Sequence, residues 1–122
     1  MNNCIKLAIF GLTLSSAASF ADDCTVPTPP TLPDGSTATL EQMLEGQKSV
    51  KEFQAANTEY RTCLEPQIAA AETAAAGDSP GPKLVEALKV LTEEYNGSVS
   101  NEEELAAQFN AKLREYKEAN PS

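Results

Sequence analysis

The chain has 122 residues and a formal net charge of −9, with 9 Lys and Arg, 18 Asp and Glu, 3 Cys, and neither His nor Trp. Without histidine, the chain lacks the side chain that most often serves as a general base near neutral pH. Its acidic excess repels nucleic acid and anionic membrane surfaces. The composition therefore argues against an enzyme and against nucleic-acid binding, and we expect no cofactor and no metal site.

Residues 1–21 read as a secretory signal peptide. Lys6 precedes an apolar run from Leu7 to Leu14, and Ser19 and Ala21 supply the small side chains that a signal peptidase requires. The run falls short of the ~20 apolar residues of a membrane span, so a retained anchor is the weaker alternative. We expect cleavage after Ala21, which leaves 101 of the 122 residues as a periplasmic or secreted chain with no membrane association.

Cys24 and Cys63 remain as a pair once Cys4 has left with the signal. Thiols of exported proteins become oxidised, so the sequence predicts a disulfide between these two residues rather than two independent thiols. The bridge would close a loop of 40 residues and stabilise the fold by roughly 4 kcal/mol. Such a constraint matters here because Leu, Ile, Val and Phe supply only 17 of the 101 mature residues.

Residues 22–38 are predicted to form a proline-rich arm. Four prolines fall between Thr25 and Asp34, which favours an extended polyproline chain without internal hydrogen bonds. The next residues, Gly35 and Ser36, continue a turn signal that begins at Pro33. The arm should therefore be extended and then reverse before the first helix.

The length of the arm is compatible with the predicted disulfide. The 16 steps from Cys24 to Leu40 span about 50 Å in polyproline form, whereas the 23 helical residues that end at Cys63 rise about 35 Å. The arm can therefore run back antiparallel along the first helix, and we expect Val26 and Leu32 to pack against the apolar stripe of that helix.

Residues 39–119 are predicted to form a single helical domain. Thr39 and Gln42 make a capping box at the start of the first helix. Apolar side chains follow at close to helical spacing; they are Leu40, Met43, Leu44, Val50, Phe53, Tyr60 and Leu64. Pro66 falls inside this pattern, so the helix either kinks there or restarts as the Ala-rich segment 67–76.

Two glycines and two prolines near residues 77–82 predict the main break between helices. Two apolar stripes follow: Leu84, Leu88, Leu91 and Tyr95, and then Leu105, Phe109, Leu113 and Tyr116. Gly97, together with a capping box of Ser100 and Glu103, indicates a possible second break near residues 96–100. The apolar phase continues through that gap, so residues 83–119 remain open to interpretation as one helix or two.

No window supports a strand, so the predicted fold class is all-α. The arrangement is a helical hairpin or a three-helix up-down arrangement, with the extended arm stapled to the first helix by the disulfide. The aromatic side chains allow two interpretations, either a core or a possible binding surface. The residues concerned are Tyr60, Tyr95, Phe109 and Tyr116.

Several segments together resemble a group of small exported α-helical proteins of proteobacteria that have no assigned function. The resemblance is carried by residues 33–35 (PDG), 41–43 (EQM) and 60–64 (YRTCL), and near the C-terminus by residues 109–110 (FN) and 113–117 (LREYK). It covers most of the mature chain and implies export, and it assigns no active-site residue.

Export, the disulfide and the lack of catalytic residue types favour a non-enzymatic module that binds a protein partner or associates with itself. A stress chaperone that exposes apolar helix faces when its carboxylates are neutralised at acid pH is one alternative. A carboxylate-based hydrolase is the competing enzymatic interpretation, and it requires two acids that converge in a cleft.

Overall fold

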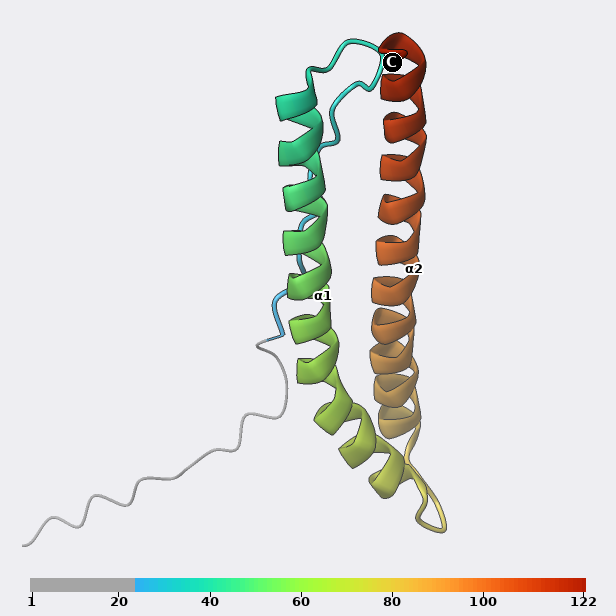
Figure 1. Cartoon of the computed structure of the whole chain (residues 1–122). Coiled ribbons are helices and arrows are strands. Elements are labelled where there is room, and N and C mark those ends of the chain that lie inside the picture. Colours follow the sequence, from blue (N-terminus) through green and yellow to red (C-terminus); the bar gives the residue numbers. More distant parts are fainter. Residues whose placement is uncertain (1–23) are drawn as a thin grey trace, which may run out of the picture.

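The computed structural model describes residues 24–122, so the predicted signal peptide lies outside the described residues. Within them the chain forms two helices and no strand, α1 (Leu40–Ala75) and α2 (Pro82–Ala119), joined by a loop at residues 76–81. The helices lie side by side and antiparallel, as a helical hairpin (Figure 1). The all-α prediction is confirmed, and the chain adopts the hairpin rather than the three-helix arrangement.

The predicted capping box starts α1. The backbone N–H of Gln42 donates to Oγ1 of Thr39 over 3.2 Å, and the backbone N–H of Thr39 donates to Oε1 of Gln42 over 2.8 Å. The helix continues through Pro66, and its last turns change direction in Figure 1. Proline removes one backbone donor and crowds the preceding turn, so α1 kinks without restarting.

The second helix is continuous across the possible second break. Pro82 occupies its first turn, where a missing N–H costs nothing. The capping box predicted for Ser100 and Glu103 is wrong, because both residues lie in the interior of α2. One glycine in a helix costs about 1 kcal/mol, and the apolar stripe of α2 continues on both sides of Gly97.

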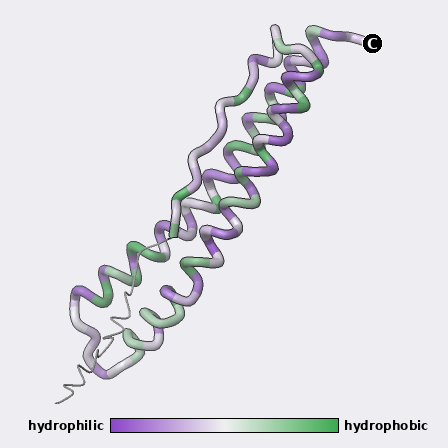
Figure 2. The backbone as a smooth tube through the Cα atoms, turned by 90° about the vertical axis from the view of Figure 1, so that its left-hand side faces the viewer, coloured by the Kyte–Doolittle hydropathy of each residue, from purple (hydrophilic) through white to green (hydrophobic). Residues whose placement is uncertain are grey.

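The arm runs antiparallel along α1. Cys24 forms the predicted disulfide with Cys63, with the two Cα atoms 5.6 Å apart, and the ring of Pro33 lies against Gly46. The nine steps from Cys24 to Pro33 therefore run beside the 17 helical steps from Gly46 to Cys63. The two lengths agree, because nine residues of polyproline span about 28 Å and 17 residues of α-helix rise about 26 Å. The arm follows the helices from the level of the disulfide to the end of the molecule where α1 begins (Figures 1 and 2).

Of the two arm residues expected to pack against α1, only Leu32 does so. Leu32 packs against the main apolar cluster, whereas Val26 is 67% exposed. The expectation for Val26 was wrong because the arm at that level borders an open groove, described below, and not the filled seam between the helices.

The core lies in the half of the hairpin where α1 begins and α2 ends. It consists of Met43, Val50, Phe53, Leu105 and Phe109, with Leu32, Ala38, Leu113 and Tyr116 packed against it. The turn that closes the arm reaches α2, because a Cβ added at Gly35 would collide with the carbonyl oxygen of Lys112. Arm and turn thus join both helices at this end.

The turn is held by a local hydrogen-bond pair. Oδ1 of Asp34 accepts from the hydroxyl of Ser36 over 2.6 Å and from its backbone N–H over 3.0 Å. Both hydrogen bonds lower the pKa of Asp34, and the bond from the Ser36 hydroxyl has the larger effect.

Neither helix within residues 24–122 combines the length and the hydropathy needed to cross a membrane.

Candidate binding groove

A polar layer closes off the core halfway along the hairpin. Nδ2 of Asn57, a residue only 2% exposed, donates to the backbone carbonyl oxygen of Ser98 over 3.2 Å. Nη1 of Arg61 donates to Oγ of Ser98 over 3.2 Å and to the carboxylate of Glu102 over 2.7 Å. These bonds pair the polar groups of the two helices, so the layer fixes their register without leaving a buried side-chain nitrogen or oxygen unpaired.

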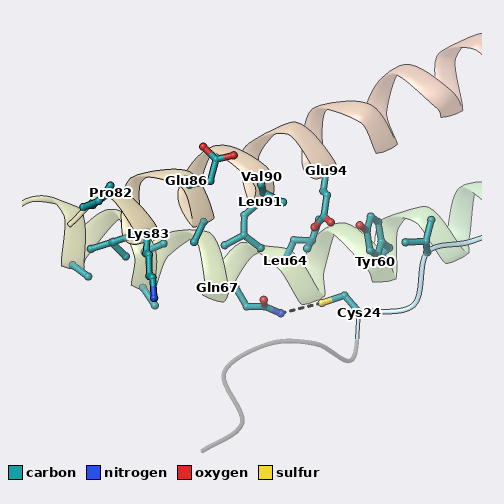
Figure 3. Close-up of a pocket in the computed structure, with 16 residues that line it drawn as sticks. Cys24, Tyr60, Leu64, Gln67, Pro82, Lys83, Glu86, Val90, Leu91 and Glu94 are labelled. Atoms are coloured by element: carbon teal, nitrogen blue, oxygen red, sulfur yellow. Dashed lines mark hydrogen bonds between the residues drawn. The ribbon is translucent and has the colours of Figure 1, made fainter. Parts of the chain in front are cut away.

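Beyond this layer the seam between the helices opens into an apolar groove of about 1100 Å³. Figure 3 shows it running from Tyr60 and Cys24 at one end to Pro82 at the loop end, with Leu64 and Leu91 between them. Leu64 is only 2% exposed and forms the floor. We call this site the loop-end groove.

Small side chains and the kink in α1 explain why the helices do not fill this space. After Pro66 the groove face of α1 presents Ala70, Ala71 and Ala74, which cannot reach across to the leucines of α2. Ala70 and Ala74 are exposed, and Val90 on the opposite wall is 42% exposed. The groove is therefore an open apolar surface and not a sealed cavity.

The two ends of the groove carry opposite charges. Lys83 lies at the loop end and Glu94 at the end near Tyr60, with the Glu94 carboxylate turned toward Leu64 and Tyr60 in Figure 3. The third charged lining residue, Glu86, has its carboxylate turned away from α1. Burial, followed by the negative charge of Glu94, raises the pKa of Tyr60.

The four aromatic residues proposed from the sequence do not form one surface. Phe109 is a member of the core and is 9% exposed, and Tyr116 packs against that core. Tyr60, which is 6% exposed, contributes to the wall of the loop-end groove. Tyr95 lines a separate cavity of about 290 Å³ that shares no residue with the groove. Tyr60 and Phe109 are thus buried, and Tyr95 and Tyr116 are partly buried, so the four residues do not form one exposed binding surface.

Within residues 24–122, no three His, Cys, Asp or Glu side chains lie close enough to hold a metal ion. Both described cysteines are joined in the disulfide, and Nε2 of Gln67 lies 3.1 Å from Sγ of Cys24 at the edge of the groove. The site therefore offers shape, apolar contact and two terminal charges as its means of recognition.

The sequence analysis missed the residues that define this groove, namely Ala70, Ala74, Ala87 and Val90. Two signals were present: an alanine-rich segment directly after a helical proline, and the stripe of Lys83, Ala87, Val90 and Glu94 at helical spacing. Reading them as a groove required knowing that the two segments face each other.

No protein-family model matches the chain, and no curated protein or solved structure matches it significantly.

Proposed function

We propose that the chain is an exported, non-enzymatic binding module, and that the loop-end groove is its binding surface for an apolar protein face. The observation that carries the proposal is the contrast between the two halves of one hairpin. One half closes on its own core under the proline-rich arm, which is stapled to α1, while in the other half the apolar seam stays open as a groove and leaves Val90 42% exposed.

The shape of the groove suits a polypeptide. Tyr60 and Ala74 are separated by 14 helical positions, about 21 Å along α1, which is the length of about four helical turns. An amphipathic helix laid in a groove contributes apolar side chains at this spacing. Covering Val90 and Ala87 would remove apolar surface from water, and this provides the driving force for binding.

The experiment places a photo-activated cross-linking residue at position 90 of the tagged chain in expressing cells. Two otherwise identical versions carry Ala87→Glu, in the groove, or Ala107→Glu, at an exposed position of α2 outside it. Both substitutions add one charge to an exposed alanine of the same helix, so they differ mainly in location.

We expect adducts at position 90 that disappear with Ala87→Glu and persist with Ala107→Glu. Adducts that survive Ala87→Glu, or the absence of any adduct in cells and in the culture medium, would contradict a role for the groove in binding. The mass of the adduct also reports whether the occupant is another protein or a second copy of the chain.

A further inference from the structure

We infer that the occupant of the loop-end groove is a second copy of this chain, laid antiparallel so that the two grooves close on each other around a two-fold axis. The inference rests on the proposed function and adds the identity and the orientation of the partner. Two features of the groove are self-complementary under this two-fold rotation: the charges along α2 and the sizes of the side chains at the two ends of the groove.

The first feature is a four-residue stripe on α2. Lys83, Ala87, Val90 and Glu94 all line the groove, and their spacing of four, three and four positions keeps them on one face of the helix. A spacing of four, three and four reads the same in reverse. An antiparallel second α2 therefore sets Lys83 against Glu94, and Val90 against Ala87, on both sides of the axis.

The centre of this stripe coincides with the centre of the groove on α1. The hydrogen bond from Asn57 to Ser98 places these residues at one level of the hairpin. Counted from this pair, the midpoint of the stripe, between Leu88 and Lys89, lies level with Pro66 and Gln67. Gln67 lies midway between Tyr60 and Ala74, which mark the two ends of the groove on α1. One two-fold axis at this level therefore relates both α1 and α2 to the same helices of the second copy.

The second feature is a difference in bulk between the two ends of the groove. Val26, 67% exposed, stands at the end near Tyr60, and the other end is lined by Ala70 and Ala74. Under the same two-fold operation Val26 of each copy meets the alanine-lined end of the other. Large side chains facing small ones pack without voids or overlap.

The opposite orientation lacks this complementarity. A two-fold axis parallel to the helices would close the grooves with α2 of each copy against α1 of the other. The groove lining of α1 carries no charged side chain, so Lys83 and Glu94 would lose the opposite charges that favour association. Within the described residues nothing else covers the groove, because the arm reaches it only at Cys24 and Val26 and then runs away from it along the core half.

The test is sedimentation equilibrium of the purified mature chain from about 5 μM to about 500 μM, for the wild type and the charge reversals Lys83→Glu and Glu94→Lys. Each single reversal replaces two attractive pairs by two repulsive ones, so we expect the dimer dissociation constant to rise about tenfold or more. The double variant restores opposite charges and should return the constant to within about threefold of the wild type.

A matched control uses the same charges on the same helix. Lys89 and Glu93 form an exposed pair 4.0 Å apart, with 63% and 67% of the two side chains exposed, and neither residue lines the groove. The reversal Lys89→Glu with Glu93→Lys should leave the dissociation constant unchanged. Circular dichroism of every variant checks that the helices remain folded.

Three results would overturn the inference: a monomer at every concentration, a dimer indifferent to Lys83→Glu and Glu94→Lys, or single variants that the double variant fails to restore. A dimer broken instead by Leu44→Glu would place the interface on the exposed leucines at the start of α1. If the chain is a strict monomer but position 90 still cross-links to another protein, only the identification of the partner as a second copy is overturned. If the chain is a strict monomer and position 90 gives no cross-link, the proposed function is overturned as well.

Discussion

Nδ2 of Asn57 donates a hydrogen bond of 3.2 Å to the carbonyl oxygen of Ser98 at the level where the filled core ends and the loop-end groove begins. The bond joins residues 41 positions apart in the chain. A buried polar contact of this kind tolerates no sliding of one helix along the other, because a shifted register would leave the amide of Asn57 unpaired. The layer therefore fixes which residues of α2 face the alanines of α1.

The ion pair in this layer should contribute more than a surface pair. Side chains of Arg61 and Glu102 are only 17% and 25% exposed, and their atoms approach to 2.7 Å. A double-mutant cycle with Arg61→Met and Glu102→Gln should give a coupling of about 1 kcal/mol in urea unfolding. The same cycle on the exposed Lys89–Glu93 pair should give a coupling of at most about 0.5 kcal/mol. Equal couplings for the two pairs would show that the polar layer does not strengthen the Arg61–Glu102 ion pair.

Two glycines of the helices should respond to alanine in opposite directions. At Gly46 an added Cβ would lie 2.9 Å from Cδ of Pro33, whereas at Gly97 it meets nothing within 4 Å. Gly97→Ala should therefore raise the free energy of unfolding by about 0.5–1 kcal/mol through helix propensity. Gly46→Ala gains the same propensity but overpacks the arm, so we expect a net loss of about 1 kcal/mol. Stabilisation by both substitutions would mean that the arm does not rest on α1.

Loss of the disulfide should release the arm and destabilise the hairpin. Replacing both Cys24 and Cys63 by serine removes a constraint across a sequence separation of 39, with an expected cost of roughly 4 kcal/mol in urea unfolding. Backbone relaxation measurements should show residues 25–31 becoming mobile while α1 and α2 keep their helicity. An unchanged unfolding midpoint together with a rigid arm would contradict this account.

The free energy of unfolding should fall in alkaline solution as Tyr60 loses its proton. Its pKa is raised above the ordinary value of 10.0 by burial and then by Glu94, so between the unfolded and folded pKa values the folded chain holds more protons. The contribution of Tyr60 is therefore complete below the unfolded pKa and is lost as the pH rises through the folded one.

Urea unfolding at about pH 9 and about pH 11 measures this contribution. Tyr60→Phe should reduce the loss of stability between the two pH values, and Glu94→Gln should reduce it partially. A loss of stability unchanged by Tyr60→Phe would show that Tyr60 does not cause it.

Local signals predicted much of the fold. The capping box of Thr39 and Gln42, the pairing of Cys24 with Cys63 and the packing of Leu32 each follow from a short motif or from a chain-length argument, and the structure contains all three. The motif at Ser100 failed because a capping signal is weak compared with an apolar face that continues through it.

The groove depends on what two distant segments do together, and for that reason the sequence did not predict it. The alanines after Pro66 are ordinary helix formers by themselves, and they create a groove only because the contact of Asn57 with Ser98 sets them opposite the start of α2. The exposure of Val26 has the same origin, since it depends on where the filled seam ends.

The most direct test of the central claim compares the methyl groups of two valines, Val50 in the core and Val90 in the groove, which are 6% and 42% exposed. With methyl-labelled valine and a soluble paramagnetic agent, the dilute chain should show strong relaxation enhancement at Val90 and little at Val50. At concentrations where the chain associates, Val90 should become protected while Val50 stays unchanged. Equal protection of both valines in the dilute monomer would mean that the groove is closed, and would contradict its role as a binding surface.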